Sequence, residues 1–229
     1  MARRVVLATN AFPAPLRGVR RRVLPIWDHV LVTEPLSAAA WESLGWRDRQ
    51  GVTDSHNLFH YFRPTPDGRV LWGGGAPEYF FGGRTAARFA DRPGTHRRLA
   101  TRFFATFPQL EGTRFTHRWG GPIDATTRST PVFGTACDGR IGYAAGFTGL
   151  GVAASRFGAQ VVLDLLAGAE TRRTRSALVR TRPLPYPPEP LRWPLVRLTH
   201  RALDRADTTA GRRGAWLRWL DRHGIGLGS

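Results

Sequence analysis

A strand followed directly by closely spaced glycines and then a helix is the feature that most limits how this chain can fold. Residues 141–145 have the apolar and small side chains of a buried strand, and residues 151–167 repeat apolar residues at helical spacing. Gly146 and Gly149 lie between the strand and the helix, and Gly151 begins the helix. Because glycine has no side chain, a ligand can approach the backbone closely at these positions. The first amide N–H groups of such a helix are unpaired and, with the helix dipole, favour a negatively charged group. The alternative is that the glycines only permit a tight turn.

The helix should pack on a sheet through one face. Val152, Ser155, Ala159, Val162 and Leu166 recur at helical spacing, and the small residues among them would allow close approach. The glycine spacing itself is Gly-x-x-Gly-x-Gly, which is the reverse of the dinucleotide-binding fingerprint. The standard motif is therefore not present in this stretch.

The rest of the first 170 residues shows mainly strand and turn patterns. Asp67-Gly68 separates two aromatic-rich runs and predicts a hairpin over residues 58–72. Ser37 is a candidate cap for a short helix, and residues 91–107 show the spacing of a longer one. Further extended segments are expected at residues 3–10, 20–34, 113–119, 131–136 and 141–145, the last two joined by the turn at Asp138-Gly139.

Charge divides the chain unevenly. The formal net charge is +17, all 34 basic residues are arginine, and residues 171–229 hold 13 arginines against 4 acidic residues. This extension begins with a proline-rich linker and should contain two short amphipathic helices, near residues 192–205 and 212–223. An arginine-rich binder of nucleic acid or of a membrane surface is one hypothesis. A coding bias towards arginine explains the same composition, and with no recognition motif present, nucleic acid is not expected as a partner.

The sequence gives little support to membrane proteins, metalloproteins, hydrolases or NTPases. Cys137 is the only cysteine and no apolar run of about 18 residues occurs, which favours a reduced, cytoplasmic protein without a transmembrane segment. In an extended segment His56 and His60 would lie about 13 Å apart, too far to share a metal. No metal site is therefore expected. The motifs of hydrolases and NTPases are also missing.

Gly142 to Gly168 closely resembles the last strand, flavin-binding loop and final helix of the D-amino-acid oxidase-like (DAO) superfamily of FAD-dependent oxidoreductases. Further segments follow in the order that this family uses, and together they extend the resemblance over roughly residues 3–168. They are Val5 to Phe12, Tyr61 to Gly74, Phe107 to Leu110, Trp119 to Pro122 and Pro131 to Gly134.

The resemblance implies an α+β fold. A mixed, largely antiparallel substrate-domain sheet (13–118) would join the carboxy-terminal strand and helix of a Rossmann-like FAD domain (1–12 and 119–170), an incomplete FAD/NAD(P)-binding fold. Residues 171–229 would form the extension. The Gly-x-Gly-x-x-Gly unit that holds the FAD pyrophosphate in the family has no counterpart here. We therefore expect the carboxy-terminal portion of such an enzyme, as a fragment or subunit of the oxidoreductase. The alternative is a non-catalytic, truncated fragment that needs an amino-terminal FAD-domain partner.

The resemblance also implies a function and a site. The expected activity is oxidation of a C–N bond in an amine or amino acid by hydride transfer to FAD, with no catalytic residue assigned. Tyr61 and Arg63 share one strand face and are the substrate candidates, Arg63 as a bidentate partner for a carboxylate. Arg128 to Thr130 stands where relatives often carry an acidic residue, so the substrate is left open. The cofactor candidates are Ala8, Thr9, Asn10, Trp119, Gly121, Gly146, Phe147, Thr148, Gly149, Leu150 and Gly151.

Overall fold

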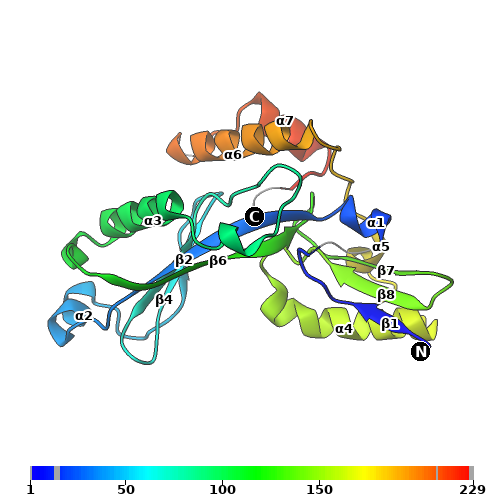
Figure 1. Cartoon of the computed structure of the whole chain (residues 1–229), viewed down its shortest axis with the longest axis horizontal. Helices are drawn as coiled ribbons and strands as arrows, with labels where there is room; N and C mark the ends of the chain where they lie inside the picture. Colours follow the sequence, from blue (N-terminus) through cyan, green and yellow to red (C-terminus); the bar gives the residue numbers. More distant parts are fainter. Residues whose placement is uncertain (1, 13–15, 210, 227–229) are drawn as a thin grey trace.

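The protein contains two sheets joined side by side and flanked by helices (Figure 1). The structure is a computed structural model, and it describes residues 2–12, 16–209 and 211–226. The larger sheet is antiparallel throughout, with strand order β3-β4-β5-β2-β6. Its strands are β2 (Leu24–Thr33), β3 (Val52–Thr53), β4 (His60–Pro64), β5 (Val70–Gly74) and β6 (Phe115–Ala125).

The smaller sheet has the order β1-β8-β7. Its strands are β1 (Val5–Leu7), β7 (Val132–Ala136) and β8 (Ile141–Ala145). β1 runs parallel to β8, whereas β7 and β8 form the antiparallel hairpin predicted from Asp138-Gly139. Within the described part of the chain, β1 is an edge strand with one side unpaired.

One face of the large sheet carries the main aromatic core. α3 (Pro93–Thr106) lies across this face and buries Leu99 and Phe103 against Leu31, Val70 and Trp72. The helix therefore forms where the phenylalanine and leucine spacing predicted it. Shorter elements connect the strands: α1 (Arg17–Arg20), α2 (Ala38–Leu44), and 3₁₀ turns at Ala87–Phe89 and Pro108–Leu110. Because β2 alternates its side chains, Trp27, His29 and Leu31 point to the α3 side, and Asp28, Val30 and Val32 point to the opposite side.

α4 (Gly151–Ala167) packs on β7 and β8, but not through the whole face that periodicity predicted. Val162 and Leu166 are buried as expected, together with Gly158 and Val161. The prediction was wrong for the other three positions, because Val152, Ser155 and Ala159 are exposed. The helix instead approaches the sheet closely at glycines: a Cβ on Gly142 would lie 2.7 Å from Cγ1 of Val162.

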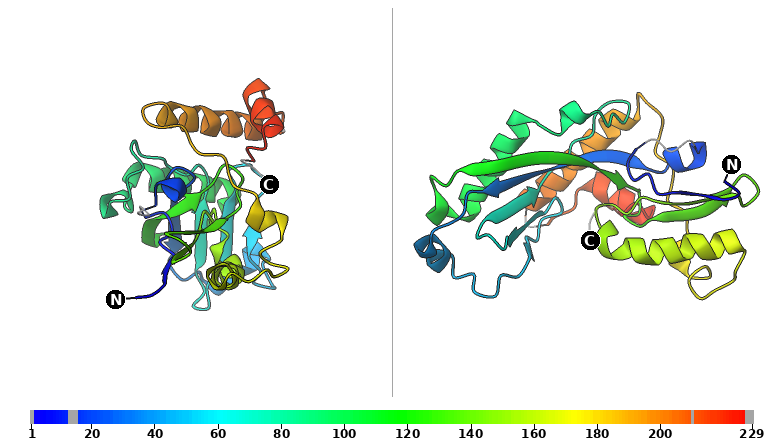
Figure 2. Two further views of the ribbon diagram at one scale, coloured as in Figure 1. Left: turned by 90° about the vertical axis from the view of Figure 1, so that its right-hand side faces the viewer. Right: turned by 60° about the horizontal axis from the view of Figure 1, so that its bottom comes forward.

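The arginine-rich extension folds back on the body of the protein (Figures 1 and 2). It contains α5 (Ala177–Arg180), α6 (Arg192–Thr208) and α7 (Ala215–Arg222). The apolar sides of α6 and α7 bury Leu203, Leu217 and Leu220 together with Leu58 of the large-sheet region. The carboxylate of Asp207 also accepts the backbone N–H groups of Asn57 (2.8 Å) and Leu58 (3.3 Å). The amphipathic pattern of the extension thus serves internal packing.

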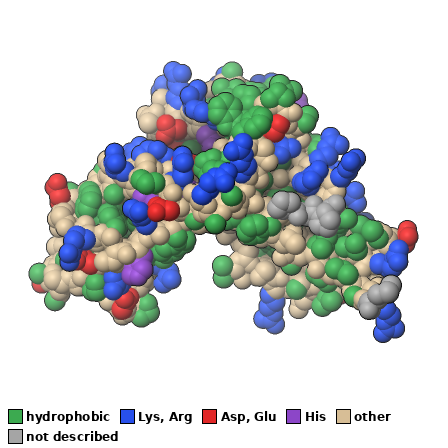
Figure 3. All heavy atoms as spheres, in the orientation of Figure 1, with side chains coloured by type: hydrophobic (Ala, Val, Ile, Leu, Met, Phe, Trp, Pro, Cys, Tyr) green, Lys and Arg blue, Asp and Glu red, His purple; other side chains and the backbone are tan. Residues whose placement is uncertain are grey.

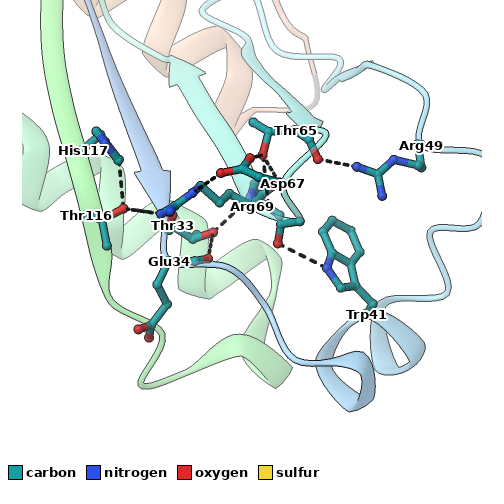
Figure 4. Close-up of polar contacts among 11 residues, drawn as sticks. Thr33, Glu34, Trp41, Arg49, Thr65, Asp67, Arg69, Thr116 and His117 are labelled. Carbon is teal, nitrogen blue, oxygen red and sulfur yellow. Dashed lines mark hydrogen bonds and ion pairs between the residues drawn. The ribbon is translucent and has the colours of Figure 1, made fainter.

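A polar network closes the end of the large sheet farthest from the small one (Figure 4). The Arg69 guanidinium donates to the Thr33 carbonyl (3.1 Å), to Thr116 Oγ1 (2.8 Å) and to Asp67 Oδ2 (2.6 Å). It therefore ties the predicted Asp67-Gly68 hairpin turn to β2 and β6. These contacts involve strand ends and turn atoms, and their role is structural.

Two expectations about local structure need correction. Residues 20–34 were expected to be one extended segment, but Arg17–Arg20 forms α1 and the strand begins only at Leu24. The two tail helices extend over 192–208 and 215–222 rather than 192–205 and 212–223. In the ranges that the structure describes, no helix combines the length and apolar character needed to cross a membrane.

Candidate functional site

The two sheets meet where β1, β8 and β6 end. Because β1 and β8 are parallel, Ala8, Thr9 and Asn10 leave the sheet at the same edge as the glycine loop that follows β8. Asn10 Nδ2 donates to the Pro122 carbonyl of β6 at 3.3 Å. Figure 3 shows the molecule hollowed between the lobe that holds β4 and the lobe that holds α4, and α4 begins beside this hollow (Figure 1).

The glycine loop is held by Asp124, near the end of β6. Its carboxylate accepts the amide N–H of Gly146 (2.6 Å) and of Phe147 (3.1 Å), and its carbonyl accepts that of Thr148 (3.1 Å). Gly146 and Gly149 have φ angles of +82° and +81°, the left-handed region that glycine adopts without strain. Burial raises the pKa of the Asp124 carboxyl, although the loop amides favour its charged form. The loop conformation therefore depends on one buried carboxylate.

The amino terminus of α4 has open amide groups. Leu150 occupies the N-cap position, and no side chain of the described residues accepts a hydrogen bond from the first turn. The side chains of Leu150 and Val152 are 66% and 98% exposed, so the start of the helix is at the surface. Unpaired N–H groups at the positive end of a helix dipole are suited to an anionic or electron-rich ligand atom.

The side of the large sheet opposite α3 brings other predicted residues together. We call this side the open face. It extends from the row that contains the Asp28–Gly121 pair to the row that contains Arg63 and His117. Tyr61, Gly73, Val30 and Trp119 form one row across β4, β5, β2 and β6. Directly paired residues point to the same side of a sheet. The row next to it, nearer the glycine loop, contains Asp28 and Gly121.

Tyr61 and Arg63 differ in what they contact. The Tyr61 ring lies over Gly73, where a Cβ would be 2.6 Å from the ring, and its hydroxyl donates to Asp28 Oδ2 at 2.6 Å. Arg63 is exposed one row farther from the glycine loop, and its guanidinium reaches only the Pro64 carbonyl, at 3.5 Å. The structure therefore joins Tyr61, but not Arg63, to the part of the sheet that borders the loop.

Sequence reasoning missed two residues, Asp28 and Asp124. Each is an acidic residue beside apolar residues within a strand, Asp28 next to Trp27 and Asp124 between Ile123 and Ala125, and such a residue needs a compensating partner. That pattern is the only signal in the sequence that points to them. Their partners, Tyr61 and the Gly146–Phe147 amides, are 33, 22 and 23 positions away, so the pairing depends on the tertiary fold.

The spacing argument for two histidines was wrong. Residues 54–59 turn back instead of running straight, and the Nδ1 atoms of His56 and His60 both lie near Asp54 Oδ2, at 3.1 and 2.9 Å. The carboxylate already occupies the space between the rings. Among the described residues no group of three or more histidine, cysteine or acidic side chains is placed to hold a metal ion.

The fold and the site together define a protein of mixed helices and largely antiparallel sheets, in which a strand–glycine loop–helix unit borders an antiparallel sheet with an open face. Comparison with known proteins gives the family. Residues 1–165 match the sequence model described as FAD dependent oxidoreductase (DAO). The chain belongs to this family, as its sequence segments predicted.

Curated relatives match the chain over part of their own length. A probable oxidoreductase OrdL from Haemophilus influenzae is 32% identical over 173 residues, which cover 73% of this chain and 37% of that protein. The gamma-glutamylputrescine oxidoreductase of Escherichia coli is 31% identical and is matched over 38% of its length, with 75% of this chain covered. The chain therefore spans less than two fifths of the relatives it matches.

Solved structures share the fold at low sequence identity. An iminodiacetate oxidase from Chelativorans sp. BNC1 superposes with a TM-score of 0.59 and 18% identity, covering 80% of this chain and 46% of that one. A glycine oxidase from Geobacillus kaustophilus gives a TM-score of 0.57 at 22% identity, covering 78% of this chain and 45% of that chain. These matches concern the arrangement of the chain and not its substrate.

Proposed function

We propose that this chain forms the substrate-binding part of an FAD-dependent oxidoreductase that oxidises a C–N bond of an amine or amino acid. The observation that supports the proposal most directly is the open amino terminus of α4, beside a glycine loop that Asp124 fixes and next to an open sheet face. The family membership and the amine and amino-acid oxidases among its relatives agree with it.

The residues present are suited to the redox end of a flavin. The amides that open α4 have no side-chain cap among the described residues, and a Cβ built on Gly121 would meet no atom within 4 Å. A Cβ on Gly149 would meet only Ile123 Cδ1, at 3.7 Å. Uncapped backbone N–H groups and unfilled space at these glycines are what a flat heteroaromatic ring with an electron-rich edge requires.

Each group of residues has its own task in this proposal. When bound, the flavin supplies hydride acceptance, and the protein supplies positioning and electrostatics. The α4 amides from Gly151 onward would stabilise negative charge on the bound ring, and the loop anchored by Asp124 would hold these amides in position. Ala8 to Asn10 border the same site from β1, while Trp119 and Gly121 form its wall on the open face.

A charge at Val152 tests the proposal. Glutamate at this exposed second position of α4 should stabilise the helix by about 0.3–1 kcal/mol through the dipole. It should also repel the electron-rich flavin edge and weaken FAD binding by up to about fivefold. Val152→Gln is the neutral control, and Leu163→Glu places the charge on an exposed position towards the other end of the helix. FAD titration followed by flavin fluorescence gives the affinities, and equal affinity for all four proteins would contradict the proposal.

A second candidate is a unit that holds flavin only when an amino-terminal FAD-domain partner completes the site. The edge of β1 favours it: Val5 and Val6 are 42% and 49% exposed, and β8 is the only strand paired with β1 in the described ranges. Exposed Val152 and Leu163 on α4 add further apolar surface that a partner would cover. An unpaired strand edge of this kind is a ready site for strand addition.

The two candidates give different results in one experiment. The purified chain is mixed with FAD, and its visible spectrum is compared with that of the chain co-expressed with the amino-terminal half of a relative such as the gamma-glutamylputrescine oxidoreductase. Bound flavin in the chain alone supports the first candidate. Flavin bound only in the co-expressed pair supports the second. Absence of flavin from both samples would reject the flavoprotein assignment.

A further inference from the structure

Asp28 is a carboxylate inside the sheet without an arginine partner among the described residues. It lies in the middle of β2, and none of the salt bridges among the described residues involves it. This is unexpected in a chain with 34 arginines and a net charge of +17. Acidic residues elsewhere, such as Glu34, Asp164 and Asp221, do have arginine partners. A half-buried carboxylate without a cation carries a desolvation cost unless a ligand supplies the charge.

Neutral donors hold the Asp28 carboxylate in place. Oδ2 accepts the Tyr61 hydroxyl at 2.6 Å, and Oδ1 accepts the His29 amide at 3.0 Å. Tyr61 reaches Asp28 only because Gly73 has no side chain beneath the ring. A carboxylate has about four acceptor sites, so these two bonds and the nearby Gly74 backbone N–H leave room for a further donor. Burial raises the pKa of the Asp28 carboxyl, although the Tyr61 hydroxyl, His29 and the Gly74 backbone favour its charged form.

Space for that further donor lies on the β6 side. Gly121 is the direct cross-strand partner of Asp28, and an added Cβ there would meet no atom within 4 Å. Trp119, one row farther along, is 43% exposed, and the Tyr61 ring borders the opposite side. A ligand at this place would touch one fixed anion between two aromatic surfaces. Aromatic faces and a carboxylate together favour an alkylammonium group.

We infer that Asp28 and Tyr61 form a binding site for the cationic amine of the substrate, with Trp119 and Gly121 as its walls. The inference rests on the proposed function, because it names the substrate class of the same site. Arg63 is the residue expected to hold a carboxylate. It lies two rows from Asp28, and these four residues along a strand separate the backbone positions by about 13 Å. Among the described residues, the carboxylate of an α-amino acid bound at Asp28 would find no arginine beside it, because the Arg63 guanidinium contacts only the Pro64 carbonyl, at 3.5 Å. The site therefore selects an aliphatic amine over a small α-amino acid.

The test needs no flavin, because the open face belongs to this chain alone. Butylammonium chloride, butyrate and butanol are titrated into the ¹⁵N-labelled chain, and the amide resonances of Trp119 and Gly121 are followed by NMR. Butylammonium should shift both resonances saturably, whereas butyrate and butanol should not. Equal shifts from butylammonium and butanol would show that any small apolar molecule binds, and this would overturn the inference.

Variants separate the charge of Asp28 from the rest of the pocket. Asp28→Asn should weaken butylammonium binding about tenfold or more, as expected when the charged partner of a hydrogen-bonded ion pair is lost. Tyr61→Phe keeps the carboxylate and should retain cation binding, and the exposed Asp48→Asn is the matched control. Undiminished binding by a folded Asp28→Asn would reject the assignment. The flavin titration at Val152 is independent, so flavin binding without amine selectivity would remove this inference and leave the proposed function standing.

Discussion

Gly146 is the position where the glycine loop should tolerate least change. Its φ angle is +82°, and a Cβ there would lie deep inside van der Waals contact with Cγ2 of Thr126. Thr126 is fully buried, and its hydroxyl donates to the Thr130 carbonyl at 2.8 Å, so the side chain cannot rotate away without losing that bond. Left-handed backbone costs a residue with a Cβ about 1–2 kcal/mol, and overpacking adds about 1–3 kcal/mol. We therefore expect Gly146→Ala to lower the free energy of unfolding by about 2–5 kcal/mol.

The neighbouring glycines provide matched controls. Gly149 has a φ angle of +81°, but its Cβ would make only an ordinary contact of 3.7 Å with Ile123 Cδ1. Gly149→Ala should thus show the backbone cost alone, about 1–2 kcal/mol. Gly151 is the first residue of α4, has no positive φ, and its Cβ would be 3.5 Å from Phe147. Gly151→Ala should be neutral or stabilise the protein by up to about 1 kcal/mol.

Urea unfolding followed by tryptophan fluorescence and far-ultraviolet circular dichroism measures these differences. A second substitution isolates the steric part: Thr126→Ser removes Cγ2 but keeps the hydroxyl bond to Thr130. In the Thr126→Ser background, Gly146→Ala should cost about 1–3 kcal/mol less than in the parent, which is the overpacking contribution. The reasoning is refuted if the two backgrounds give the same cost, or if Gly151→Ala destabilises as much as Gly146→Ala.

Three further predictions concern other parts of the molecule. Asp124→Ala should cost about 2–4 kcal/mol in urea unfolding, because the amides of Gly146 and Phe147 lose their acceptor, and Asp124→Asn about half as much. Asp207→Ala should speed proteolysis within residues 171–226 and cost about 1.5–3 kcal/mol, while the exposed Asp204→Ala should change neither. Burial lowers the pKa of His200 to about 4, so the folded state binds this proton less readily than the unfolded chain. Stability should fall by at most about 3 kcal/mol as pH drops from 6.5 to 4, and His200→Gln should flatten that slope in pH-dependent unfolding.

Short-range patterns predicted much of this fold. The turn at Asp67-Gly68 forms, Ser37 Oγ accepts the Ala40 amide at the start of α2, and the strand alternation puts Tyr61 and Arg63 on one face. Each of these features depends on residues a few positions apart. Local propensity and side-chain alternation are sufficient for predictions of that kind.

Features that depend on distant segments escaped prediction. The buried side of α4 was misplaced because the helix contacts β8 at Gly142 and includes Gly158, and glycines contribute nothing to an apolar periodicity. The link between Asp28 and Tyr61 requires β4 and β2 to lie on either side of β5. That strand order cannot be read from either segment alone.

The division of the chain into a substrate domain (13–118) and a partial FAD domain stays a prediction. Strand β6 crosses the expected boundary and connects the two parts. This strand runs unbroken from Phe115 to Ala125, across the expected division at residue 118. Its first half carries Trp119 on the open face, and its second half carries Asp124, which fixes the glycine loop. Because one rigid strand holds both groups, a shift of the loop relative to the open face would have to break hydrogen bonds between β6 and β2. The positive end of α4 and Asp28 are therefore held at a set separation, which in the proposed function would keep the electron-rich ring edge and the cationic amine on different sides of the same site.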